Sequence, residues 1–155
     1  MPFQVVALSE QEFADLFSMD DRALRGRGAK RYIADRTPGF PCRVSLEDAS
    51  PGEVVILAPF VHQPADSPYK ASGPIFVRNR ARPASPGIGD VPELLRSRLL
   101  SVRAYDHASL MREADVVDGR ELEAVVERMF GDSGNSYLHV HFARPGCYAC
   151  RIDRA

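Results

Sequence analysis

Alternation of hydrophobic and polar residues predicts several strands. Over residues 42–47 apolar side chains alternate strictly with polar ones, which is typical of a strand with one face on a core. Residues 99–106 and 137–143 show the same alternation. Residues 54–61 are apolar at nearly every position, so they predict a strand that is covered on both faces and lies centrally in its sheet.

Weaker patterns complete the predicted sheet. The mixed charge of residues 110–117 suits a strand at an edge. Short apolar or alternating runs predict further strands at residues 3–8, 30–34, 75–77 and 147–153.

The clearest helix is predicted after Asp118, which with Glu121 resembles a capping box. Gly131 closes the helix. Short helices are expected after Ser9 and after Asp20 or Asp21. We therefore predict an α+β fold, with a mostly antiparallel, curved sheet, one long helix and short N-terminal helices. The apolar stripe of the long helix consists of Leu122, Val125, Val126, Met129 and Phe130.

Two segments without periodicity are expected to be loops. Residues 62–74 carry three prolines between two apolar strands, and connections of this length are usually functional or disordered. We interpret this segment as an ordered loop over one end of the sheet. Residues 79–90 are polar and rich in proline and glycine, which makes them a candidate mobile segment and a possible protein-interaction surface.

Composition narrows the functional classes. The 155 residues are expected to form a single domain over residues 1–155. A net charge of −1 gives no electrostatic reason to expect a nucleic acid or a membrane as partner, and the oligomeric state is not indicated. No apolar run approaches the roughly 18 residues that a membrane-spanning helix needs, and the first residues do not resemble a signal peptide. The three cysteines do not suggest a secreted disulfide scaffold. We therefore expect a cytoplasmic protein.

Four segments together resemble a known family. They are FPCRVSLEDASPGEVVIL, SPYKASGPIFVR, LLSVRAYD and YLHVHFARPGCYACRIDRA. The chain resembles, over essentially its full length, the bacterial proteins grouped as domain of unknown function 1203. The resemblance implies no activity, cofactor or catalytic residue, so no residue role follows from it.

Polar residues on the non-core phases of several strands form the main candidate site. Arginine and histidine suit an anionic ligand, through charge-assisted and bidentate hydrogen bonds. We expect these side chains to line a concave sheet face that is closed by the loop over residues 62–74, although a solvent-exposed sheet face is the alternative. The candidate ligand-binding residues are Arg43, His62, Tyr69, Ser72, Arg103, Tyr105, His139 and His141, with Ser45 and Lys70 nearby.

A metal-assisted enzyme is the second hypothesis. His139 and His141 lie on one face of a strand, a spacing that can supply two ligands to zinc or iron. A two-residue loop at Pro145-Gly146 would place Cys150 opposite His141 as a third ligand, whereas a slip of one residue would turn Cys150 away. No metal is favoured, because two spaced histidines are better explained as hydrogen-bonding residues on a polar or partly covered sheet face.

Two patterns of cysteine residues are weaker indications of catalytic chemistry than the paired histidines. Cys147 and Cys150 have the spacing of a redox pair, but they lie on a predicted strand without the following helix that activates such a motif. Cys42 and His62 would make a nucleophile and base, yet Cys42 is in phase with buried positions. Because no catalytic motif is complete, whether the protein is an enzyme stays open, and binding of an anionic small molecule is favoured.

Overall fold

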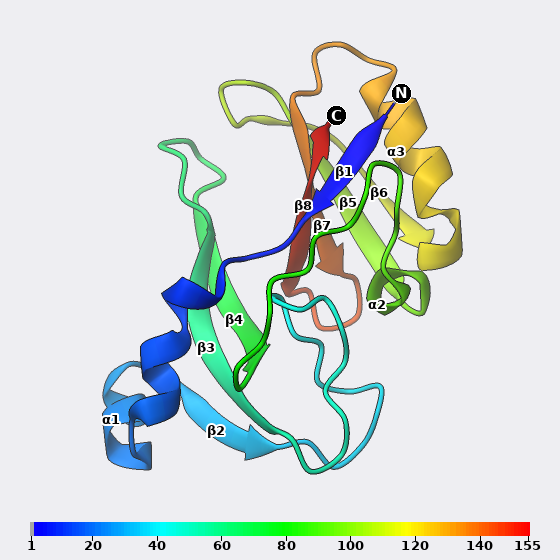
Figure 1. The fold of residues 1–155 in the computed structure, drawn as a ribbon. Helices are drawn as coiled ribbons and strands as arrows, with labels where there is room; N and C mark the ends of the chain where they lie inside the picture. Colours follow the sequence, from blue (N-terminus) through cyan, green and yellow to red (C-terminus); the bar gives the residue numbers. More distant parts are fainter. Residues whose placement is uncertain (1) are drawn as a thin grey trace.

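The computed structural model describes residues 2–155 as two antiparallel sheets (Figure 1). A five-stranded sheet has the order β1-β8-β7-β5-β6, and a three-stranded sheet has the order β2-β3-β4. The α+β class is confirmed, but the strands are divided between two sheets. The strands are β1 (Phe3–Val6), β2 (Lys30–Ile33), β3 (Val54–Gln63), β4 (Ala71–Arg78), β5 (Leu99–Tyr105), β6 (Met111–Asp118), β7 (Tyr137–Phe142) and β8 (Tyr148–Arg154).

The helices are short except at one place. Asp20 accepts a hydrogen bond from Ala23 N and so caps the first α-helix, as its sequence position predicts. Among the residues described, no helix has the length and hydrophobicity that crossing a membrane requires. The helices are the 3₁₀ turns η1 (Glu10–Glu12), η2 (Ala14–Ser18) and η3 (Gly119–Glu121), and the α-helices α1 (Asp21–Gly26), α2 (Glu93–Arg96) and α3 (Leu122–Phe130).

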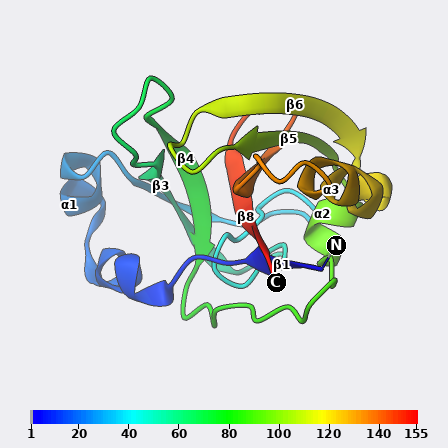
Figure 2. The ribbon, with the colours of Figure 1, turned by 90° about the horizontal axis from the view of Figure 1, so that it is seen from above.

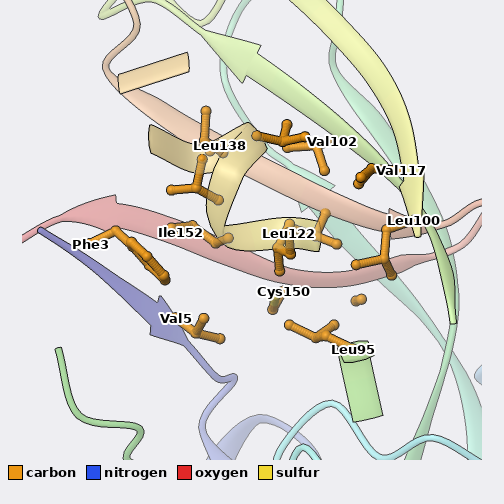
Figure 3. Close-up of a cluster of buried hydrophobic side chains, with 14 of the residues drawn as sticks. Phe3, Val5, Leu95, Leu100, Val102, Val117, Leu122, Leu138, Cys150 and Ile152 are labelled. Atoms are coloured by element: carbon orange, nitrogen blue, oxygen red, sulfur yellow. The ribbon is translucent and has the colours of Figure 1, made fainter. Parts of the chain in front are cut away.

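Helix α3 covers one face of the five-stranded sheet, and the hairpin β3–β4 approaches the other face (Figures 1 and 2). The apolar stripe predicted for α3 is buried, with Leu122 and Phe130 both fully inaccessible. It packs against Val102 of β5, Leu138 of β7 and Ile152 of β8 (Figure 3). The five-stranded sheet is therefore covered on one side by the apolar face of α3 and on the other by the second sheet.

The prediction of a strand over residues 42–47 is wrong. This segment is a compact turn in which Leu46 N donates to Cys42 O, and only isolated bridges form at Pro41 and Cys42. Cys42, Val44 and Leu46 are buried as the alternation predicts, but they reach two different cores because the turn lies between the two sheets. Arg43 is buried as well, so the alternation here does not divide a core face from a polar face.

The long loop is shorter than predicted. Strand β3 continues through His62 to Gln63 and β4 begins at Ala71, so residues 64–70 alone connect the two strands. A β-bulge between Phe60 and Gln63 interrupts the pairing near this end, two residues beyond Pro59. His62 is therefore held on a strand, which positions its ring more firmly than a loop.

The β7–β8 hairpin has a register that neither sequence alternative gives completely. His139 pairs with Arg151 and Val140 with Cys150, which is the register shifted by one residue. A β-bulge then places Tyr148 opposite His141. The prediction of a two-residue loop that pairs His141 with Cys150 is thus wrong, because Phe142 N donates to Cys147 O and residues 143–146 form the turn.

Candidate functional site

One face of the five-stranded sheet carries a continuous row of polar and aromatic side chains. Strand β5 contributes Arg103 and Tyr105, and β7 contributes Tyr137, His139 and His141. Arg103 pairs directly with His139 in the ladder, and Tyr105 pairs with Tyr137. These positions share one face because side chains at i and i+2 of a strand project to the same side.

The second sheet brings His62 onto this face. Its ring centroid lies 5.0 Å from that of His141 and 6.3 Å from that of His139. The ring also stacks on Tyr148 of β8, with centroids 5.5 Å apart and an interplanar angle of 15°. We call His62, His139, His141 and Tyr148 the histidine cluster; it joins β3 to β7 and β8.

The histidine cluster is largely withdrawn from solvent. His139 is 3% exposed and His141 is 1% exposed, so the alternative of a solvent-exposed sheet face is wrong for these two residues. Nδ1 of His62 and Nδ1 of His139 are both buried, and neither has a hydrogen-bond partner. Most buried polar atoms in proteins have a partner, so these two nitrogens need an explanation.

His141 differs from its two neighbours because both of its ring nitrogens have contacts. Nδ1 lies 3.0 Å from the carbonyl oxygen of Gly146, and Nε2 lies 3.4 Å from Nη1 of Arg103. Since a carbonyl only accepts, the proton belongs on Nδ1, which leaves Nε2 to accept from the guanidinium. This tautomer satisfies both contacts with a neutral ring.

The electrostatic surroundings keep all three imidazoles neutral. The pKa of His139 is lowered to about 3, chiefly by burial and then by the neighbouring His141 and His62. Burial also lowers the pKa of His141 to about 4, against the opposing effect of its hydrogen bond to Gly146. The pKa of His62 is lowered by burial and then by the positive charge of Arg103. At neutral pH the rings therefore act as neutral hydrogen-bonding groups.

Tyrosine rings extend the site beside His139. Tyr105 stacks on Tyr137 with centroids 5.3 Å apart, and Tyr69 packs edge-on against Tyr105 at 5.9 Å. Gln63 Nε2 donates to the hydroxyl of Tyr137 at 2.9 Å, and that hydroxyl donates to Oγ of Ser109 at 2.7 Å. Burial raises the pKa of Tyr105, so this wall of the site is aromatic and uncharged.

A cavity of about 400 Å³ borders the histidine cluster. His62, Ser72 and Tyr148 line it, and Arg43 and Cys147 form another part of its wall. This volume lies within the range of sites that hold small molecules. The cavity thus gives the buried cluster a neighbouring space of the size of a small ligand.

The structure brings most of the predicted site residues together, but not all. His62, Arg103, Tyr105, His139 and His141 meet in one interface, with Tyr69 at its edge. Ser72 lines the adjacent cavity.

Two predicted neighbours lie elsewhere. Arg43 is not on a strand face with Arg103, because residues 42–47 form a turn, and its guanidinium is buried against the backbone of Pro41 and Tyr148. The hydroxyl of Ser45 accepts a hydrogen bond from Arg78 at 3.2 Å. Ser45 does not line the cavity beside the histidine cluster, whereas Arg43 forms part of the wall of that cavity.

The proposed metal ligands do not converge. Cys150 lies in the apolar core with Ile152 and Leu122 rather than beside His139 and His141 (Figure 3). Burial raises the pKa of this thiol to about 12, which opposes formation of the thiolate that a metal requires. Within residues 2–155, no three histidine, cysteine or acidic side chains are arranged to hold a metal ion.

Comparison with known proteins places the chain in a family. A family model described as "Protein of unknown function (DUF1203)" matches residues 39–154. The chain belongs to the DUF1203 family. The DUF1203 match contains every residue of the histidine cluster and Arg103, whereas β1 and β2, which complete the two sheets, precede it. No curated protein and no solved structure matches the chain.

Sequence reasoning about this DUF1203 protein missed three members of the site. Tyr148 was not a candidate because its face depends on the bulge in the β7–β8 hairpin, which no local pattern marks. Gln63 was assigned to a loop, although it ends β3 and is 2% exposed. Tyr137 shares the alternating phase of His139 and His141, so this phase could have identified it.

Proposed function

We propose that this DUF1203 protein binds a small organic carboxylate at the interface between its two sheets. Arg103 supplies the positive charge, since none of the ion pairs formed by residues 2–155 involves it. Its contacts with Ser101 and His141 are both 3.4 Å long, which makes them weak hydrogen bonds. A guanidinium with this freedom suits a carboxylate, which can accept two parallel N–H bonds from it.

The two unsatisfied imidazole nitrogens are the observation that carries the proposal. A buried polar atom without a partner costs about 1–3 kcal/mol, and here Nδ1 of His62 and Nδ1 of His139 lie in one cluster. A neutral imidazole protonated at Nδ1 donates to a carboxylate oxygen. A ligand that joins these nitrogens to Arg103 would satisfy both histidines and neutralise the guanidinium.

The aromatic surroundings favour a carboxylate with a planar apolar group. Tyr105 is 2% exposed and Tyr148 is 5% exposed, so their rings offer apolar surface within the interface. Aromatic pairs contribute about 0.5–1.5 kcal/mol beyond the burial of their area. We therefore expect an aromatic carboxylate to bind more tightly than acetate.

The test is a titration of the purified protein with sodium benzoate and with sodium acetate at matched ionic strength. The ring nitrogen signals of His62, His139 and His141 are followed by NMR, and exposed His107 serves as the internal reference. We expect saturable shifts at the three buried rings, at lower concentrations of benzoate than of acetate.

Variants connect this signal to the site. Arg103→Gln should remove the saturable shifts, whereas Arg22→Gln, which removes the same charge from the exposed face of α1, should keep them. If neither carboxylate moves the ring signals of the wild-type protein, or if Arg103→Gln binds as well as the wild type, the proposal is wrong.

A further inference from the structure

A second, larger cavity lies apart from the histidines. It has a volume of about 690 Å³ and shares Arg43 and Cys147 with the smaller cavity, but no histidine lines it. Asp118 is the one acidic residue in its wall. Six arginines line the same cavity, namely Arg36, Arg43, Arg96, Arg98, Arg120 and Arg144.

Internal carboxylates neutralise two of the six guanidinium groups. Arg98 forms a bidentate pair with Asp48, with distances of 2.6 and 2.9 Å. Arg96 forms a similar pair with Glu123, at 2.7 and 3.1 Å.

The other four arginines leave the cavity with uncompensated charge. Arg36 lies 3.5 Å from Asp35, and both of these side chains are mostly exposed, so their pairing is weak. No ion pair within residues 2–155 involves Arg43, Arg120 or Arg144. The cavity therefore carries a clear excess of positive charge.

Arg43 is the most unusual of these residues, because it is 1% exposed. Its guanidinium donates to the carbonyl oxygen of Tyr148 at 2.7 Å, to that of Pro41 at 2.5 Å and to Sγ of Cys147 at 3.0 Å. These contacts satisfy three of its five N–H groups and bring no carboxylate to it. A buried charge without a counter-charge is costly, so an anion in the adjoining cavity would stabilise it.

The cavity also offers apolar surface beside the charge. The guanidinium groups of Arg43 and Arg98 lie 4.9 and 5.0 Å from the centre of the Phe142 ring. Phe76 and Leu99 line the cavity as well. Two cations beside one aromatic ring create a strongly positive region with an apolar wall.

We propose that this cavity binds a small molecule that carries a phosphate group and an apolar group. A phosphate has close to two negative charges and three acceptor oxygens, which suits several converging guanidinium groups. The free charges of Arg120 and Arg144 hold it from the rim, and the charge of Arg43 attracts it from the floor. The apolar group lies against Phe76 and Leu99. This site differs from the carboxylate site in its cations, since Arg103 supplies the charge there, although the smaller cavity beside the histidine cluster shares Arg43 and Cys147 with this one.

Cys147 provides a reporter for the cavity. It lines the cavity and is partly exposed, whereas Cys42 and Cys150 are 0% and 1% exposed. We would measure the rate at which the neutral reagent iodoacetamide alkylates Cys147, by mass spectrometry, with increasing phenyl phosphate or inorganic phosphate at constant ionic strength. Phenyl phosphate should slow the alkylation saturably, and at lower concentrations than inorganic phosphate.

A double variant tests the role of the arginines. Arg120→Gln with Arg144→Gln should weaken binding of phenyl phosphate about tenfold or more, since both lost partners are charge-assisted donors. Arg22→Gln with Arg25→Gln removes the same charge from α1 and should leave protection unchanged. Calorimetric titration with phenyl phosphate measures the same affinity without relying on the thiol.

Three outcomes would overturn the proposal. The first is equal protection of Cys147 by sodium chloride at the same ionic strength, which would mean that only screening is involved. The second is a double variant of Arg120 and Arg144 that binds phenyl phosphate as tightly as the wild type. The third is a calorimetric titration that detects no binding to the wild-type protein. Arg103→Gln separates this site from the carboxylate site, because it should leave binding of phenyl phosphate unchanged.

Discussion

The imidazole rings of His62 and His141 meet edge to face, with centroids 5.0 Å apart and planes at 83°, although they belong to different sheets. The contact joins β3 to β7 across a polar interface in which His139 and His141 are 3% and 1% exposed. Two protonated rings at this separation would repel each other, and burial would oppose both charges. The interface therefore depends on the neutral form of its histidines, which makes its stability sensitive to acid.

We predict that acid destabilises the protein through His139 and His141. Their pKa values fall from the ordinary value of 6.5 to about 3 and about 4 in the folded state. Below pH 6.5 the two imidazoles therefore bind protons in the unfolded chain and stay neutral in the folded chain until the pH approaches their lowered pKa values. Their contribution is present above pH 6.5 and is lost as the pH falls toward 4, on the order of 3 kcal/mol for each histidine. Urea unfolding between pH 7 and pH 4 measures this loss.

Carboxylates also titrate in this range, so the histidine contribution needs its own variant. The glutamine of His139→Gln cannot take up a proton. The free energy of unfolding of this variant should therefore fall less steeply with decreasing pH than that of the wild type, and the two slopes should differ by up to about 1.4 kcal/mol per pH unit. The matched control is His107→Gln, which makes the same substitution at an exposed histidine outside the histidine cluster. Equal slopes for the wild type and His139→Gln would contradict the prediction.

The hydroxyl of Tyr137 is expected to hold the aromatic wall of the site in place. It accepts from Gln63 and donates to Ser109, and Gln63 is 2% exposed. Tyr137→Phe leaves the amide of Gln63 without this acceptor and should cost about 1–3 kcal/mol in urea unfolding. Tyr69→Phe changes a residue that is 39% exposed and should cost less than about 0.5 kcal/mol. If Tyr137→Phe leaves the free energy of unfolding unchanged, the amide of Gln63 must find another hydrogen-bond partner.

The sequence predicts the parts of this fold that local periodicity determines. The stripe of residues 122–130 identifies α3, and alternation over residues 99–106 assigns Leu100 and Val102 to the core, where both are buried. Alternation also places His139 and His141 on one face. These patterns succeed because each residue's environment follows from its own strand or helix.

The failures come from contacts between segments that are distant in sequence. Cys42 and Val44 are buried as predicted, but the same periodicity arises in a turn that fills the space between two sheets. The meeting of His62 with His141 requires one sheet to pack on the other, and Tyr148 reaches them through a bulge. Periodicity reports burial along a segment and contains no information about which segment covers it.

The ion pair between Arg98 and Asp48 is expected to stabilise the fold more than the other pairs. Its side chains are 18% and 14% exposed, and both carboxylate oxygens accept from the guanidinium. Asp48→Ala leaves the mostly buried Arg98 side chain charged and without its carboxylate partner, so we expect a loss of about 2–3 kcal/mol. Asp21→Ala breaks the pair with Arg31, in which Asp21 is 75% exposed, and should cost less than about 1 kcal/mol. Urea unfolding at neutral pH compares the two variants, and similar losses would show that burial does not strengthen the Arg98 pair.

Gly119 should tolerate no side chain, because the backbone before β5 passes directly over it. A Cβ at this position would overlap the carbonyl oxygen of Leu95 and lie 2.8 Å from that of Arg98, whose oxygen accepts from Gly119 N. Relief requires movement of backbone between α2 and β5, so Gly119→Ala should cost about 3 kcal/mol or more. Gly26→Ala is the matched control: nothing lies within 4 Å of a Cβ at this helix end, and the change should be neutral or stabilise by up to about 1 kcal/mol. Thermal and urea unfolding measure the stability of both variants. If Gly119→Ala is as stable as Gly26→Ala, the backbone between α2 and η3 can move apart at little cost in free energy, and the prediction is wrong.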